Sequence, residues 1–273
     1  MPENSKKTEP SGTTSDQAPG NQASGDQTPG GQGASATMPL FYQKPEPLSA
    51  STHSGKGLRR PADFRFAATT HAVVLHAEEF RLACANYPIV FADDDSAVPI
   101  AVLGHGQGRN LFVDAMGNWE RDTYIPAYVR RYPFINGRGA TENDVVLYVD
   151  AASDLLVDLA DNPDAEPLFV DGQPSERCKR ALDFCIAFQA QAPVTSAFVE
   201  EIKSRDMLER RNVRVDLQGG TQRQLTGLRV ISEKAFNALP DDVWLEWRRK
   251  GWVSLVHWHW ASMDNFVRMS KRA

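Results

Sequence analysis

The chain has 273 residues, which is enough for one large domain or two small ones. Hydrophobic residues make up 41% and charged residues 24%, as in an ordinary globular protein. The net charge of −5 lacks the basic surplus that is usual in nucleic-acid-binding proteins, so nucleic acid is not an expected partner.

No segment of the sequence indicates export or a membrane span. The two lysines near the start are followed by no apolar stretch, and no apolar run approaches the roughly 20 residues that cross a bilayer. We therefore expect a cytoplasmic protein, while surface association by a route other than Sec stays open. Docking of the Trp-rich C-terminal helices at a membrane interface is a further alternative.

The first 37 residues differ in composition from the rest. They are rich in Ser, Thr, Gly, Gln and Pro, lack aromatic residues, and contain the degenerate repeat DQAPG, NQASG, DQTPG. Such a segment cannot bury enough apolar surface to offset its ordering entropy. We predict a disordered leader over 1–37, or alternatively a tail that binds a partner, and one folded domain over 38–273.

The first half of that domain is predicted to form short strands. Residues 39–62 contain four prolines and indicate an extended arm. Short apolar or alternating runs predict strands at 63–70, 73–75, 88–92, 98–103, 111–113 and 144–150, and a helix at 77–86. The three runs between 88 and 113 predict an antiparallel meander.

The second half is predicted to be mainly helical. Helices are expected at 175–190, 193–210 and 252–268, with short helices that begin after Ser232 and at Asp241. Hairpins are expected around the Asp171-Gly172 and Gly219-Gly220 turns. The predicted fold is α+β, with one antiparallel sheet of short strands, from 63–150 and 212–231, covered by helices from the C-terminal half.

The three cysteines are too few and too widely spaced for a disulfide framework. Cys178 and Cys185 lie two turns apart on one face of a predicted helix, which is typical of buried apolar thiols. A metal or redox role for them or for Cys84 would need nearby ligands that the sequence does not supply. We expect no metal and no cofactor.

The order and spacing of several short motifs resemble the SapC-like family of bacterial proteins. The motifs are PADFRFAATTHAVVLHAEEFRLACANYPIVFADD, VPIAVLG, NLFVD, a Trp and YIPAYVRRYPF, and the similarity runs from about Phe41 to the C-terminal end. His259, Ser262 and Asn265 resemble the closing pattern of that family. The resemblance implies an association with bacterial surface layers and no established reaction. The leader before Met38 departs from the family's usual short N-terminus.

Aromatic and arginine side chains alternate between residues 119 and 134. Trp119 and Tyr124 precede Arg130 and Arg131, on or near a short predicted helix that begins close to Pro126. The two arginines could grip a carboxylate or phosphate, with the aromatic rings as a stacking platform. The alternative is a helix that packs its tyrosines on the sheet and leaves its arginines in solvent.

Two loops superficially resemble ligand-binding motifs. Asp93, Asp94 and Asp95 do not fit the spacing of an EF-hand, because Ala97 stands at the fifth position and no Glu at the twelfth. The run Gly104-His105-Gly106-Gln107-Gly108 lacks the Gly-Lys-Ser/Thr ending of a P-loop and does not open a helix. We interpret both as turns between strands.

The run His257-Trp258-His259-Trp260 suggests a metal pair only if it is a strand, because residues two apart point about 200° apart in a helix. Its apolar stripe favours a helix. His259 is then either a packed, hydrogen-bonded residue or an active-site residue that meets a carboxylate such as Asp114 or Asp264. Asn265 lies two turns further and is a candidate ligand-binding residue with it.

Two classes of function stay open from the sequence. The first is a non-catalytic binding or accessory protein, with a possible protein partner at the cell envelope, as the family resemblance suggests. The second is an enzyme or modifying partner that acts on a peptide or small molecule in a pocket near His259. The motifs G-x-S-x-G, H-E-x-x-H and C-x-x-C do not occur, although a catalytic triad can assemble from distant positions.

The leader assignment predicts where the folded unit begins. Limited proteolysis of the full chain, followed by N-terminal sequencing of the resistant core, is expected to give a core that starts near Met38. A stable core that retains residues 1–30 would contradict it.

Overall fold

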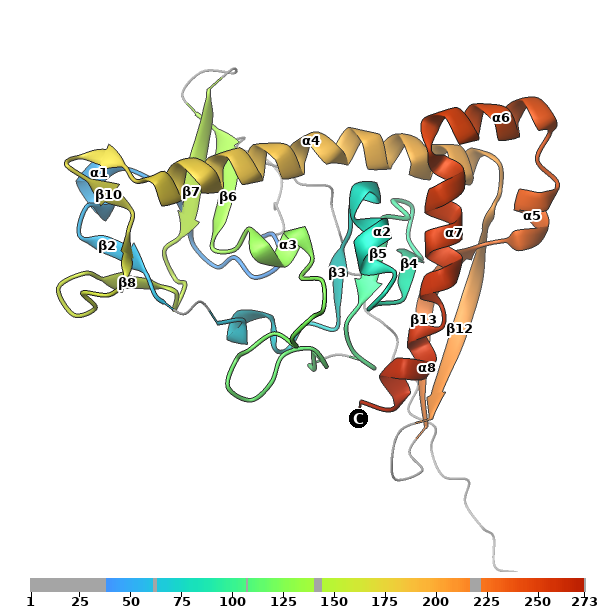
Figure 1. Cartoon of the computed structure of the whole chain (residues 1–273), viewed down its shortest axis with the longest axis horizontal. Helices are drawn as coiled ribbons and strands as arrows, with labels where there is room; N and C mark the ends of the chain where they lie inside the picture. Colours follow the sequence, from blue (N-terminus) through green and yellow to red (C-terminus); the bar gives the residue numbers. More distant parts are fainter. Residues whose placement is uncertain (1–37, 61–62, 107, 140–143, 217–221, 273) are drawn as a thin grey trace, which may run out of the picture.

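The computed structural model describes residues 38–60, 63–106, 108–139, 144–216 and 222–272. The predicted leader and the Gly219-Gly220 turn lie outside these ranges. The described chain is α+β, with antiparallel sheets and helices concentrated in the C-terminal half (Figure 1). The predicted fold class is therefore confirmed. None of its helices is both long enough and apolar enough to cross a membrane, within the described residues.

The largest sheet has five antiparallel strands in the order β12-β13-β4-β5-β3. The strands are β3 (Ala72–Val74), β4 (Ile89–Ala92), β5 (Pro99–Val102), β12 (Leu208–Asp216) and β13 (Gln222–Ile231). The predictions at 73–75, 88–92 and 98–103 are confirmed, and so is the long hairpin. The register of that hairpin shifts between Arg211 and Val213, beside Gly227, whose positive φ of 74° is typical of a β-bulge.

The remaining strands form separate small sheets, so the predicted single sheet is wrong. One contains β1 (Pro45–Pro47), β7 (Val145–Asp150) and β6 (Phe134–Arg138), and a second contains β8 (Leu156–Asp158), β2 (Lys56–Leu58) and β9 (Glu166–Pro167). A short hairpin joins β10 (Phe169–Val170) to β11 (Gln173–Pro174), as predicted around Asp171.

The predicted arm at 39–62 is also corrected, because it forms β1, the helix α1 (Ala50–His53) and β2. The carboxylate of the buried Asp150 fixes the start of this segment, since it accepts hydrogen bonds from the backbone N–H groups of Gln43 (3.1 Å) and Lys44 (2.7 Å). The prolines leave the chain extended, and distant partners turn that extended chain into strands.

Two predicted strands are absent from their described segments. Residues 63–70 contain the 3₁₀ helix η1 (Arg65–Ala67), and the rings of Phe64 and Phe66 still pack inward, against Trp119 and Tyr132. The run at 111–113 makes only an isolated bridge, between Val113 and Trp119.

The side chain of Asn110 accounts for the missing strand at 111–113. Its Oδ1 accepts from the backbone N–H of Phe112 (2.9 Å) and its Nδ2 donates to Ala67 O (3.1 Å). These bonds tie the segment to Ala67 at the end of η1. The glycine-rich loop before it does reverse the chain. A side chain at Gly104 would lie 2.0 Å from the carbonyl of Arg109, so only glycine fits there.

Most helices of the structure are short, and one long helix replaces two predicted ones. The short ones are η2 (Ala77–Glu79), α2 (Phe80–Ala83), α3 (Ala127–Arg130), α5 (Glu233–Asn237), α6 (Asp241–Lys250) and α8 (Asn265–Ser270). The two helices predicted at 175–190 and 193–210 are one helix, α4 (Glu176–Ser204), which runs through Pro193. Pro193 is exposed, so water can donate to the carbonyl that the missing N–H leaves free.

The ends of other helices follow their capping residues. Ser232 accepts a hydrogen bond from Ala235 N at the start of α5, and Gly251 ends α6 with a φ of 76°. The helix predicted at 252–268 is divided into α7 (Trp252–Ser262) and α8. At the division, Met263 N donates to Trp260 O and Phe266 N to Met263 O, which are the i→i−3 bonds of a tighter turn.

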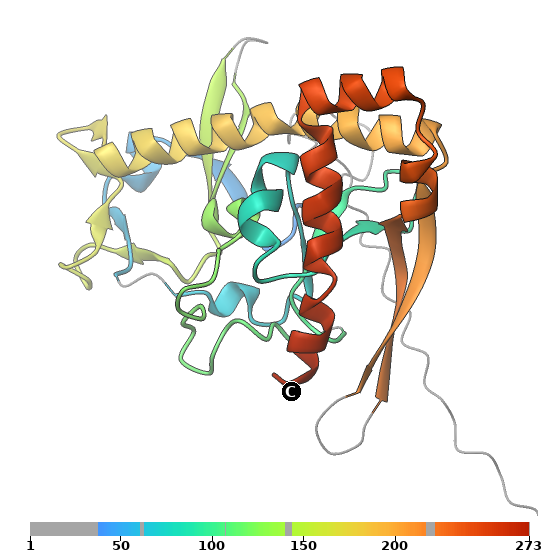
Figure 2. The ribbon, with the colours of Figure 1, turned by 45° about the vertical axis from the view of Figure 1, so that its right-hand side comes forward.

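Helices α7 and α8 lie on opposite faces of the five-stranded sheet. Leu255 and Val256 of α7 share a core with Ile89 and Phe91, whereas Phe266 of α8 shares another core with the alternate residue, Val90. Neighbouring residues of a strand point to opposite faces. Strands β4 and β13 pair at only two positions, Ala92 with Leu228 and Phe91 with Arg229. The helix pair therefore crosses the sheet where these strands separate (Figure 2).

Candidate functional site

His259 occupies the gap between β4 and β13. Continuing the register by two residues would place Ile231 opposite Ile89. Instead, the N–H of Ile231 donates to Nε2 of His259 (3.0 Å), and Nδ1 of His259 donates to Ile89 O (2.7 Å). The ring therefore takes the place of a rung of the ladder, and its proton lies on Nδ1.

Two neighbours of His259 complete the junction. The hydroxyl of Ser262 accepts from Ile89 N (2.9 Å), and Nε1 of Trp260 donates to Ile231 O (2.9 Å). Side chains of α7 thus satisfy all four backbone groups that the two isoleucines would otherwise exchange. We call this arrangement the α7 junction.

The α7 junction holds His259 in the core of the protein. The residue is fully buried, and burial lowers its pKa to about 4, so it is neutral near pH 7. Both ring nitrogens bond to backbone groups and neither meets a carboxylate. Asp114 instead accepts from the backbone of Met116 (2.9 Å) and Asn118 (2.8 Å) in its own turn.

The run from His257 to Trp260 lies in the helix α7, as its apolar stripe predicted. His257 is exposed, and its Nδ1 lies 2.7 Å from Val253 O of its own helix. Across the described ranges, no group of three or more His, Cys, Asp or Glu side chains is placed to hold a metal ion. Cys178 and Cys185 are buried in the core, as predicted, and Cys84 is partly buried.

Asn265 fastens the end of α2. Its Nδ2 donates to Cys84 O (2.8 Å), and its Oδ1 accepts from Arg268, which also donates to Ala85 O. Asn265 is buried, so this predicted ligand-binding residue serves the core in the described structure. His259 and Asn265 therefore hold successive parts of one segment, residues 76–92, which contains η2, α2 and β4.

Trp119 also lies in the core. Its Nε1 donates to the hydroxyl of Tyr87 (3.2 Å), and its ring contacts Phe64 and Phe112. The hydroxyl of Tyr87 donates to the carbonyl of Tyr124. Trp119 and Tyr124 are thus linked through Tyr87, but the buried indole cannot line an open groove.

Tyr124 sits above a buried carboxylate, Glu79. The oxygen Oε1 of Glu79 accepts from the Tyr124 hydroxyl (2.9 Å) and from Ala127 N (2.7 Å), and Oε2 accepts from His76 N (2.9 Å). Burial raises the pKa of Glu79, and the donors act against that shift. Burial and the nearby Glu79 carboxylate both raise the pKa of Tyr124, which keeps its hydroxyl protonated as a donor.

Arg130 is the exposed member of this network. Its Nε donates to Ile125 O (3.0 Å) and its Nη2 to the hydroxyl of Tyr124 (3.1 Å). The guanidinium carbon lies 5.5 Å from the ring centre of Tyr124 and 5.1 Å from that of Phe184 on α4. Its Nη1 has no hydrogen bond to any described residue, so a fixed guanidinium presents one amino group outward.

Arg131 does not join Arg130 in a common grip. It is buried, and its guanidinium carbon lies 4.1 Å from the ring centre of Tyr128 and 4.6 Å from that of Phe188. Successive residues of a helix point about 100° apart, which separates the two arginines. The predicted four-residue groove is therefore corrected to Tyr124, Arg130 and Phe184, which we call the Arg130 platform.

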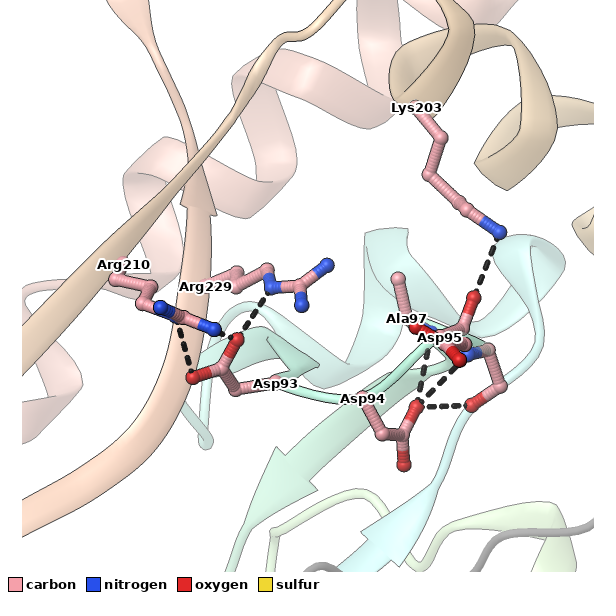
Figure 3. Close-up of polar contacts among 8 residues, drawn as sticks. Asp93, Asp94, Asp95, Ala97, Lys203, Arg210 and Arg229 are labelled. Atoms are coloured by element: carbon pink, nitrogen blue, oxygen red, sulfur yellow. Dashed lines mark hydrogen bonds and ion pairs between the residues drawn. The ribbon is translucent and has the colours of Figure 1, made fainter.

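The Asp93–Asp95 turn has structural partners of its own (Figure 3). Arg210 and Arg229 are opposite each other on β12 and β13, and both bond to the carboxylate of Asp93 (2.8 and 2.6 Å). Burial alone would raise the pKa of Asp93, but the two arginines lower it. Lys203 donates to Asp95 O (2.7 Å). The prediction of a turn, rather than a calcium loop, agrees with these contacts.

In a comparison with protein-family models, residues 48–269 match the SapC family. The chain belongs to the SapC family. No curated protein and no solved structure matches it significantly. The matched region of this SapC protein contains the α7 junction, Glu79 and the Arg130 platform.

Sequence reasoning missed Glu79, Tyr87 and Phe184. The only local signal for Glu79 was an acidic residue three positions after His76 at a helix start, where its side chain reaches back to His76 N. Phe184 belongs to a helix some fifty residues after Arg130, so no local pattern could pair them.

The burial of Glu79 generates a prediction about stability. In Glu79→Gln the amide group must present N–H donors toward Tyr124, Ala127 or His76, which are themselves donors. We expect the free energy of unfolding to fall by about 1–3 kcal/mol, measured by chemical denaturation. Glu78→Gln, at the exposed neighbouring position, is the matched control and should change it little. Equal effects of the two substitutions would count against the network.

The α7 junction generates a second prediction, with a pH dependence. His259→Ala leaves Ile231 N–H and Ile89 C=O without the partners that His259 supplies. We therefore expect the free energy of unfolding to fall by about 2–4 kcal/mol at pH 7. His257→Ala, on the exposed side of the same helix, is the control.

Protonation of His259 should reduce this difference. Its pKa is about 4 in the folded chain against an ordinary value of 6.5, so the unfolded chain binds the proton first as the pH falls. The difference in the free energy of unfolding between wild type and His259→Ala is complete above pH 6.5. It should shrink by up to about 3 kcal/mol by pH 4. Denaturation at several pH values measures this, and a constant difference would contradict it.

Proposed function

We propose that this SapC protein is a non-catalytic accessory protein that binds an acidic segment of a protein partner through the Arg130 platform. The observation that carries the proposal is the fixed guanidinium of Arg130, which is exposed and keeps Nη1 free of described partners. Its planar donors match a carboxylate.

Pre-organisation makes Arg130 a better anchor than an ordinary surface arginine. Two hydrogen bonds and two aromatic rings already hold its side chain, so binding costs less side-chain entropy. The position of Tyr124 is in turn fixed by Glu79 and by Asn86, whose Oδ1 accepts from Tyr124 N (3.0 Å). The position of Arg130 therefore depends, through Tyr124, on residues of the core.

The same structure weighs against the alternative of an enzyme with His259 as its base. Proton transfer by His259 would break one of the two bonds that close the α7 junction. Glu79, the buried carboxylate beside the platform, already accepts three hydrogen bonds. These groups act as fixed structural partners, which suits binding better than proton transfer.

The expected setting of this binding is the bacterial envelope. The link rests on the family's association with surface layers, which the sequence resemblance implies. The partner is expected to be an envelope or surface-layer protein, met from the cytoplasmic side or after export by a route other than Sec.

The proposal is tested by affinity capture from soluble and envelope fractions of native cells, with the full chain as bait. Wild type is expected to retain an envelope protein, and Arg130→Ala to weaken that retention at least about tenfold. Arg130→Lys, which keeps the charge without the planar fork, should be intermediate. Arg81→Ala is the matched control, because Arg81 is an exposed arginine on α2. Retention by Arg130→Ala equal to wild type would contradict the proposal.

A further inference from the structure

The outer face of α4 is apolar over three turns. Figure 1 and Figure 2 show this helix along one edge of the molecule. Ile186 is 41% exposed and Val194 53%. The exposed apolar positions of this stretch recur at helical spacing and share one face: Ile186, Ala187, Ala190, Pro193, Val194 and Ala197. An aliphatic face of this kind commonly marks an interaction site.

Opposite charges flank this apolar face. Arg180 lies toward the N-terminal end of α4, with its side chain 68% exposed, and Glu200 lies toward the other end, with its side chain 69% exposed. Within the described residues, Arg180 pairs with Glu166 at 3.6 Å and Glu200 pairs with Lys203 at 2.9 Å. Both remain accessible to a second molecule.

We propose that this face pairs with the same face of a second copy, with the two α4 helices antiparallel and Ala190 on the two-fold axis. Such an axis brings together residues at equal distances before and after Ala190. Ile186 then lies level with Val194 of the second copy, and the end of α4 that carries Arg180 lies level with the end that carries Glu200. Two-fold symmetry forms each contact twice. The Arg180 end of each α4 therefore lies by the Glu200 end of the other α4, which allows two ion pairs. A parallel arrangement would oppose like charges.

A neighbouring helix can add to the contact made by α4. Helix α6 lies beside the C-terminal third of α4, where Trp247 donates to Glu201 (3.3 Å) and contacts Phe198. In both views α6 rises beside α4 there, and the hairpin of β6 and β7 rises beside the N-terminal half of α4 (Figure 1, Figure 2). Trp244 and Leu245 on α6 are exposed and can extend the apolar contact.

The small side chains at the centre allow close approach of the two helices. Ala187, Ala190 and Ala197 add little bulk between the axes, and Ile186 and Val194 supply the larger apolar contacts. The partner this surface fits is therefore another copy of the chain, and the pairing is separate from the Arg130 platform.

The experiment measures the mass of the full chain in solution over a range of concentrations. We expect a reversible dimer. Ala190→Arg places two arginines against each other on the axis and should raise the dissociation constant at least about tenfold. Val267→Arg, on the exposed side of α8, is the matched control and should leave the dimer intact. A chain that is monomeric throughout, or a dimer that survives Ala190→Arg, would overturn the proposal.

A charge exchange tests the register. Arg180→Glu and Glu200→Arg should each weaken the dimer, and the double variant should restore it, because the ion pairs form again in reverse. In a Cys84→Ser background, Ala190→Cys should give a disulfide-linked dimer. Ala197→Cys should not, since its two copies would lie about 21 Å apart along the helix axes. Failure of the rescue, with crosslinking at Ala197 instead, would overturn the antiparallel register.

Discussion

The α7 junction is the interaction on which the arrangement of this protein depends. A sheet whose neighbouring strands β4 and β13 separate would expose the backbone groups of Ile89 and Ile231, and unpaired buried groups of this kind are costly. His259, Ser262 and Trp260 satisfy them from one helix. This lets α7 and α8 cover opposite faces of the same sheet. The hairpin of β12 and β13 is consequently held by the junction, by two pairs of strand residues and by Asp93.

Residues 76–92 connect that junction to the Arg130 platform. Glu79 and Asn86 hold Tyr124 from one side, and Asn265 bonds to Cys84 from the other. Tyr87 joins Trp119 to the same stretch. An exposed guanidinium is therefore oriented by buried polar groups, and a substitution in the core can change its orientation without touching the surface.

Polar residues in this SapC protein divide by burial into two kinds. His259, Asn265 and Glu79 are buried with defined protein partners, and their contribution is to the fold. Arg180 and Glu200 keep most of their side chains exposed, and Arg130 keeps one amino group without a hydrogen bond to a described residue. A histidine or carboxylate that stands out in a sequence is thus a poor guide to catalysis until its partners are known.

The sequence by itself determined the features that depend on neighbouring residues. Alternation and turn residues predicted the strands at 73–75, 88–92 and 98–103 and the long hairpin, and Ser232 and Gly251 marked helix ends. Only the tertiary structure decided that α4 continues through Pro193, that Asn110 prevents a strand at 111–113, and that Arg130 rather than Arg131 faces outward. The reason is distance along the chain: His259 meets Ile89 across 170 residues, and no local pattern encodes such a contact.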